Sequence, residues 1–220
     1  MSVAQISYSE ARIKMKPGDV IAFGGKGEFS EIIKLATFSD VSHVGVILQT
    51  QVKDDSDDHF FNQIIESTSL NGFNGVNISR FSDRLNTYEG ELWWLPLGDD
   101  VRLKLNAKIF YDFLFNQAKG RKGYDMPQAI KSALDALDKL PLVGHGPTYN
   151  KEDFSKFFCS ELVAAGLEVG GAVATVNASE VTPIDLCMWK IFSGTYYQLK
   201  GDKNKKIKRY NTASPSDWNV

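Results

Sequence analysis

Cysteine and histidine are scarce in this sequence. Its 220 residues include two cysteines, Cys159 and Cys187, and three histidines. No Cys-x-x-Cys pair and no Cys/His cluster occurs, so the sequence predicts neither a disulfide framework nor a structural zinc site. We therefore expect two free thiols, no bound metal and no cofactor.

The sequence also has no large excess of positive or negative charge and no long stretch of apolar residues. Lys and Arg number 25 against 27 Asp and Glu, and the net charge of −2 gives no reason to expect a nucleic acid or an anionic membrane as partner. No stretch approaches the length of a membrane span, and the first 16 residues lack the apolar centre of a signal peptide. The expectation is a cytoplasmic protein without stable membrane insertion.

The chain shows no internal repeat and no low-complexity segment. With 43% hydrophobic residues, it is long enough to bury a core without crosslinks. We expect one domain over residues 1–220. The glycine-rich run Gly24-Gly25-Lys26-Gly27 lacks the spacing and the Ser/Thr of a phosphate-binding loop, so it is interpreted as a turn.

Cys159 stands where an apolar segment leads into a predicted helix. Apolar residues recur after it at helical spacing, which places Cys159 near the helix N-terminus. Free backbone N–H groups and the positive end of the helix dipole stabilise a thiolate at such a position. A lone cysteine is more often a buried packing residue, so the pattern by itself leaves both interpretations open.

His43 begins the β-branched segment 43–48, whose period of two puts His43, Gly45 and Ile47 on one face. A single histidine at a strand start is more often structural than catalytic. The segment 60–68 is predicted to pair with it antiparallel through an acidic loop, and there Glu66 comes within reach of His43. We consider His59 and His145, both in predicted loops, poor candidates for a base.

The remaining pattern predicts short strands and helices around these residues. The predicted strands cover 20–23 and 91–97, and the predicted helices cover 105–119, a stretch from Asp125 to Leu140, and a short one from Pro183 that carries Cys187 as a packing residue. We expect a helical and loop insertion around 125–155, and a C-terminal hairpin and tail over 195–220.

Four segments in this order resemble the permuted branch of the NlpC-type papain-like superfamily, most closely the YiiX-like amidases. They are Gly18-Asp19-Val20-Ile21 leading through 32–37 to Ser39–Gly45, then Ile65-Glu66-Ser67, then Gly123-Tyr124-Asp125, then Phe158-Cys159-Ser160-Glu161-Leu162-Val163. Together they span about residues 17–186. In the permuted branch the His strand precedes the Cys helix, as it does here.

This resemblance implies an α+β, circularly permuted papain-like fold in which an antiparallel sheet or partial barrel packs against helices. It makes Cys159 the nucleophile, His43 the base and Glu66 the residue that orients His43. It also places Tyr124 beside the site, and we take Tyr124 and Ser160 as candidates for substrate or oxyanion contact. A nucleophile, a base and an orienting group are what acyl transfer requires.

The leading hypothesis is thus a cysteine amidase or peptidase that cleaves an amide of a small peptide or amino-acid conjugate, such as a cell-wall-derived one, through a thioester. A lipid acyltransferase or lipase of the lecithin-retinol acyltransferase type is the first alternative, because the permuted branch resembles those proteins too. A non-catalytic binding module is the second. The sequence does not indicate the oligomeric state.

Overall fold

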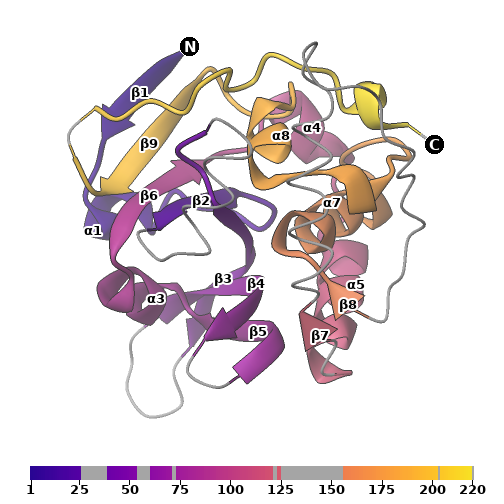
Figure 1. Ribbon diagram of the computed structural model, residues 1–220. Helices are drawn as coiled ribbons and strands as arrows, with labels where there is room; N and C mark the ends of the chain where they lie inside the picture. The colour runs from indigo at the N-terminus through magenta and orange to yellow at the C-terminus, as the bar shows by residue number, and fades with distance from the viewer. Residues whose placement is uncertain are drawn as a thin grey trace.

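A computed structural model describes residues 1–25, 39–53, 60–70, 73–120, 123–124, 156–202 and 204–219. The fold is α+β: a seven-stranded sheet packs against helices (Figure 1). The expected helix at the start of the 125–155 insertion, the loop after it, and His59 and His145 lie outside the described residues.

The sheet has the strand order β1-β9-β6-β2-β3-β4-β5. Its strands are β1 (Ser2–Gln5), β2 (Val20–Gly25), β3 (His43–Lys53), β4 (Phe60–Leu70), β5 (Phe73–Arg80), β6 (Gly90–Leu95) and β9 (Thr195–Lys200). β1 and β9 are parallel and every other neighbouring pair is antiparallel, so the sheet is mixed. The order leaves β1 and β5 as edges, and the sheet is not closed into a barrel. The expected antiparallel sheet or partial barrel is thus an open, mixed sheet, antiparallel except where the N-terminal strand β1 joins β9.

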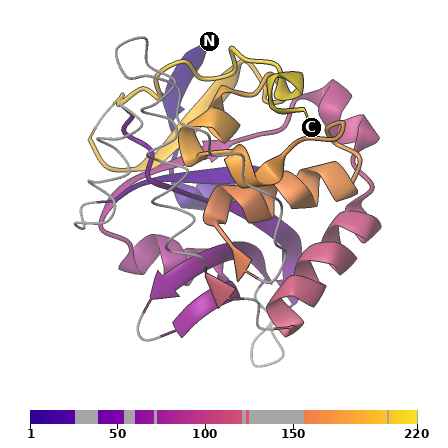
Figure 2. The same ribbon diagram turned by 45° about the vertical axis from the view of Figure 1, so that its right-hand side comes forward.

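Helices cover both faces of the sheet. They are α1 (Tyr8–Ala11), α3 (Phe81–Thr87), α4 (Asp99–Lys104), α5 (Ala107–Lys119), α7 (Cys159–Val169) and α8 (Pro183–Met188), with short 3-10 turns at Ala178–Glu180 and Pro215–Trp218. A small parallel pair, β7 (Gly123–Tyr124) and β8 (Lys156–Phe157), lies beside α5 in Figures 1 and 2.

Alternation along the strands divides the core between the two faces. Val44, Val46 and Leu48 of β3 join the large core formed with α5, α7 and α8. Ile47 faces the other way, into a smaller core that includes Phe81 of α3. The predicted period of two in this strand is thus confirmed.

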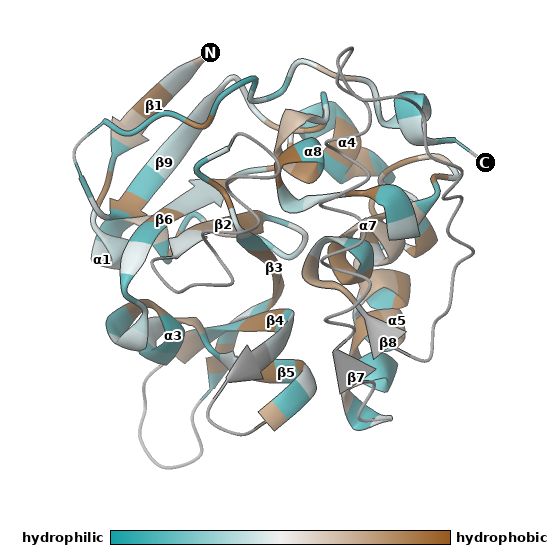
Figure 3. Ribbon diagram, viewed as in Figure 1, coloured by the Kyte–Doolittle hydropathy of each residue, from teal (hydrophilic) through white to brown (hydrophobic). Residues whose placement is uncertain are grey.

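Helix α7 is central because its first turns and its middle are buried, and it packs against β3, β4 and α5. Helix α5 has one buried face, formed by Phe110 and Leu114, and carries both hydrophilic and hydrophobic residues in Figure 3. The two helices approach closely at Gly166, where an added Cβ would lie 2.9 Å from Leu114 Cδ2. This contact holds α7 in place over the sheet.

The C-terminal hairpin expected over 195–210 does not form. β9 is a strand, but it pairs with β1 and β6, and residues 206–210 form turns and irregular structure. Ile207 donates its N–H to the Tyr196 hydroxyl at 2.7 Å, and Ile207 and Tyr210 are buried. The returning segment is therefore held by side-chain packing and not by a strand ladder.

Candidate functional site

His43 is the first residue of β3, and its ring is 15% exposed. β3 pairs antiparallel with β4 through Val46–Ile65 and Ile47–Ile64, and extending this register by one residue places Gly45 opposite Glu66. Residues 43, 45 and 66 then share one face of the sheet. The predicted approach of Glu66 to His43 is present: His43 Nε2 and Glu66 Oε2 lie 2.7 Å apart.

Gly45, which lies between His43 and Ile47 on the same face of β3, is closely packed. An added Cβ at Gly45 would lie 2.9 Å from Ile64 Cδ1 and 3.2 Å from the Ile65 carbonyl oxygen. The room beside the strand is thus filled by Ile64. A side chain at position 45 would disturb the β3–β4 pairing that sets the distance between His43 and Glu66.

Cys159 is the first residue of α7, as predicted, and Phe158 is its N-cap. The Phe158 N–H donates to Glu161 Oε2 at 3.1 Å, which fixes the start of the helix. The N–H groups of a first helical turn have no partner within the helix, so they and the helix dipole favour negative charge at Cys159. Cys159 is a free thiol and 1% exposed.

Cys159 lies close enough to His43 for its charge and hydrogen bonding to raise the pKa of the imidazole. Because His43 Nε2 is engaged with Glu66, Nδ1 is the ring nitrogen left for the sulfur. Three residues that are far apart in the sequence thus form one line, from sulfur to imidazole to carboxylate.

The charges of this line support one another. Burial alone would lower the pKa of His43, but the charge and hydrogen bond of Cys159, together with those of Glu66, outweigh it and raise this pKa to about 9. Burial alone would raise the pKa of Glu66, yet the hydrogen bond and charge of His43, with a contribution from Arg84, bring it below its ordinary value. His43 is therefore held as an imidazolium beside an ionised carboxylate.

Arg84 is the site residue that sequence reasoning missed. Its Nε lies 2.6 Å from Glu66 Oε1, and its Nη2 lies 3.3 Å from Glu66 Oε2. β5 continues to Arg80 and α3 begins at Phe81, so Arg84 lies on a helix directly after the strand. The sequence holds one indication of this: Arg84 follows the apolar Phe81 by three residues, and residues i and i+3 share a face of a helix.

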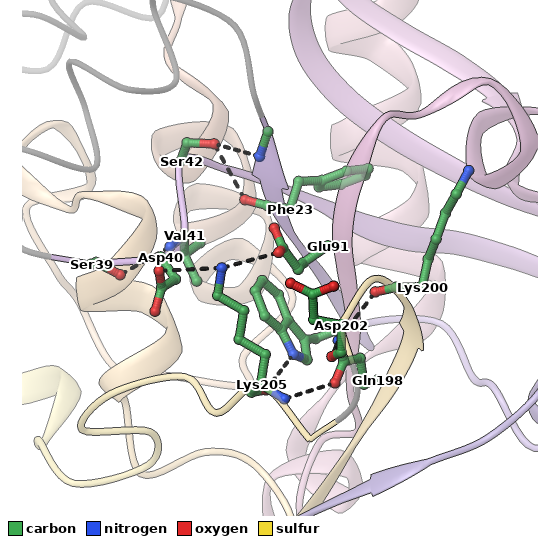
Figure 4. A network of polar contacts seen from close by, with 12 residues as sticks. Phe23, Ser39, Asp40, Val41, Ser42, Glu91, Gln198, Lys200, Asp202 and Lys205 are labelled. Atoms are coloured by element: carbon green, nitrogen blue, oxygen red, sulfur yellow. Dashed lines mark hydrogen bonds and ion pairs between the residues drawn. The ribbon is translucent and has the colours of Figure 1, made fainter.

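The segment just before His43 is fixed by a separate network, drawn in Figure 4. The Ser42 hydroxyl accepts from the Gly25 N–H at 3.2 Å and donates to the Phe23 carbonyl at 3.3 Å. Lys205 Nζ lies 3.0 Å from Glu91 Oε1 and 3.4 Å from Asp40 Oδ1. The C-terminal segment is thus tied to residues 39–42, which lead directly into His43.

The two accessory candidates have different surroundings. The backbone of Tyr124 in β7 pairs with that of Phe157 in β8, two residues before Cys159, which brings the chain at Tyr124 beside the approach to the sulfur. Ser160 is fully buried, and its hydroxyl donates to the Val181 carbonyl. That hydroxyl ties α7 to the segment before α8 and is therefore engaged within the fold.

Cys187 lies within α8 and is fully buried in the larger core. Burial, followed by the charges of Asp185 and Cys159, raises the pKa of its thiol far above the ordinary value. A thiol that stays protonated is a poor nucleophile, in agreement with its interpretation as a packing residue.

Within the described ranges, no group of three or more His, Cys, Asp or Glu side chains is arranged to hold a metal ion. In the same part of the chain, no helix is long and apolar enough to span a membrane.

Comparison with known proteins gives a distant structural likeness. No protein-family model matches the sequence, and no curated protein matches it either. Among solved structures, the metalloprotein YiiX from Escherichia coli O157:H7 (DUF1105) superposes with a TM-score of 0.46 and 16% identity over 73% of this chain and 69% of that one. The chain therefore has a distant YiiX-like structural neighbour.

Proposed function

We propose that this protein is a cysteine hydrolase that cleaves an amide bond of a small peptide or amino-acid conjugate through a thioester. The observation that carries the proposal is the line Cys159–His43–Glu66, with the sulfur at a helix N-terminus and the carboxylate 2.7 Å from the imidazole. A histidine with a purely structural role would need only the Glu66 contact and no thiol beside its second ring nitrogen. A nucleophile, a base and an orienting group in series are the requirement of covalent acyl transfer.

In the first half of the reaction, the Cys159 thiolate attacks the amide carbonyl carbon and a C–S bond forms. The carbonyl oxygen becomes an oxyanion, and in this proposal the N–H groups at the start of α7 are its donors. The intermediate collapses when the C–N bond breaks and the His43 imidazolium gives its proton to the leaving amine. An acyl thioester on Cys159 and a neutral His43 remain.

In the second half, neutral His43 accepts a proton from water, and the resulting hydroxide attacks the thioester carbonyl. The C–S bond breaks, the acid leaves, and sulfur and imidazole return to the ion pair. Glu66 keeps one hydrogen bond to Nε2 throughout, which holds the ring in the orientation that serves both halves.

The proposal extends to the fold family. His43 on β3, Glu66 on β4 and Cys159 on α7 occur in the order of the permuted NlpC-type papain-like proteins, His strand first and Cys helix last. This order, with the YiiX-like resemblance of the sequence motifs, supports membership in that branch, and an amide of a small peptide as substrate.

The experiment that tests the proposed function is hydrolysis of matched amide and ester substrates by the purified protein. We expect turnover of short peptide amides, including cell-wall-type peptides, with an acyl group trapped on Cys159 by mass spectrometry when the reaction is quenched early. Turnover of phospholipid esters alone would favour the acyltransferase or lipase alternative. Absence of any acyl adduct across the set would favour a binding module.

Replacing Glu66 by glutamine should slow hydrolysis by roughly tenfold, less than the loss of His43 itself. The glutamine amide keeps an acceptor for Nε2 but lacks the charge that stabilises the imidazolium, so the pKa of His43 falls from about 9. The alkaline limb of the pH–rate profile, which reports loss of the imidazolium proton, should therefore move to lower pH. Glu66→Ala loses acceptor and charge, and should be slower still.

Asp19→Asn is the matched control, because Asp19 is also a buried carboxylate paired with an arginine, Arg102. This control variant should leave the alkaline limb of the pH–rate profile unchanged. If the Glu66→Gln profile superimposes on that of the wild type, Glu66 is only a structural residue at a strand and another group orients His43.

A further inference from the structure

Arg84 contacts both oxygens of Glu66. Its Nε donates to Oε1 at 2.6 Å and its Nη2 to Oε2 at 3.3 Å, while Oε2 also receives His43 Nε2 at 2.7 Å. We propose that Arg84 is a positioning residue of the catalytic line: its two-pronged contact fixes the plane of the Glu66 carboxylate and thereby aims Oε2 at His43. This inference rests on the proposed function only in naming the line catalytic.

A fork is needed here because a carboxylate held by one contact can rotate. Two parallel N–H···O bonds from a planar guanidinium fix both the position and the plane of the carboxylate. With Oε1 committed to Arg84, rotation of the Glu66 group would break a charge-assisted bond before it moved Oε2 off the imidazole. A lysine at position 84 would keep the positive charge, but its ammonium group makes a point contact and cannot fix the plane of the Glu66 carboxylate.

Arg84 is itself immobilised by two aromatic rings. Its guanidinium carbon lies 4.8 Å from the ring centroids of both Phe23 and Tyr88, and these two rings meet edge to face at 4.9 Å. Phe23 also packs against the ring of His43, with centroids 5.1 Å apart. Phe23 thus contacts both His43 and Arg84, the residue that we propose positions Glu66.

The side chains that make these contacts are largely shielded from water. The Arg84 side chain is 10% exposed and that of Glu66 is 1% exposed. In the ion-pair form the signs alternate along the line from thiolate to imidazolium, carboxylate and guanidinium, and the four charges sum to zero. A buried charge without its partner is costly, so Arg84 also lets Glu66 remain ionised at its buried position.

The test is the rate at which iodoacetamide alkylates Cys159, followed by mass spectrometry in Arg84→Lys. This variant keeps the charge and loses the fork, so any change reports geometry. A misplaced Glu66 holds the imidazolium less well and lowers the thiolate fraction, and we expect alkylation at neutral pH to fall roughly tenfold. In the Glu66→Gln background, where no carboxylate remains to be aimed, Arg84→Lys should change the rate less than about twofold.

Arg80→Lys is the control for loss of a guanidinium stacked on an aromatic ring. Arg80 lies one turn before Arg84, with its guanidinium 4.4 Å from the Phe61 centroid, and it is exposed. It should leave the alkylation profile unchanged. Superimposable profiles for Arg84→Lys and wild type, or an equal loss with and without Glu66, would overturn the proposal.

Alkylation needs no substrate, so failure of the two proposals can be told apart. A protein that hydrolyses no amide but shows the coupled loss in this cycle would retain the positioning role of Arg84. A protein that hydrolyses amides but shows no coupling would retain the function and lose this inference.

Discussion

Replacement of Cys159 by alanine will abolish amide hydrolysis while the protein stays folded. The reaction needs the sulfur as nucleophile, and loss of the nucleophile in comparable covalent enzymes lowers kcat by about 10⁴-fold or more. The packing loss is small, because Cys159 is the first residue of α7 and only its Sγ atom is removed. Steady-state hydrolysis, with circular dichroism as a check on folding, measures both effects.

Cys187→Ala is the matched control, because it removes the same atom from a second buried cysteine. Its thiol has a strongly raised pKa and lies in the core, so the variant should keep most of the activity and lose some stability from the small cavity. Near-normal turnover of Cys159→Ala, or labelling of Cys187 first by an active-site alkylator, would show that the nucleophile is assigned wrongly.

Replacement of His43 by alanine should lower the hydrolysis rate by ~100- to 10,000-fold, the usual contribution of a general acid–base group. The loss has two causes: the thiolate loses its counter-charge, and the leaving amine loses its proton donor. The wild-type rate should fall as pH rises through about 9, because the imidazolium loses its proton there. In His43→Ala this limb should vanish from the profile.

His59→Ala serves as its control, since His59 lies in an acidic stretch of the sequence away from the site motifs. It should retain wild-type turnover. A comparable loss in both variants would place the base elsewhere or show that histidine replacement acts through stability.

The approach of Glu66 to His43 and the position of Cys159 at a helix start could be predicted from sequence because each depends on local rules, whereas joining Cys159 to His43 relied on the family resemblance. The period of two along 43–48 and the antiparallel return through 60–68 bring Glu66 to the face of His43, and the register confirms this pairing. The apolar spacing after Cys159 predicts the helix whose first residue it is. Each inference required only neighbours in the chain or one strand pair.

Features that depend on distant packing were missed. Arg84 lies on α3, and the first residue of that helix, Phe81, is buried in the core. The position of Arg84 thus depends on how α3 packs. The N-terminal strand β1 pairs in parallel with β9, which lies near the other end of the sequence, and no local pattern predicts this pairing. The segment 206–210 alternates like a strand, yet burial of Ile207 and Tyr210 against other side chains decides its conformation.

The most direct test of the thiolate–imidazolium site is the rate of Cys159 alkylation at neutral pH in the wild type and in His43→Ala. We predict that iodoacetamide alkylates wild-type Cys159 readily at neutral pH and that His43→Ala loses most of this reactivity, because the imidazolium that holds the thiolate is gone. If the two proteins are alkylated at the same rate, no ion pair exists and the proposed chemistry is contradicted.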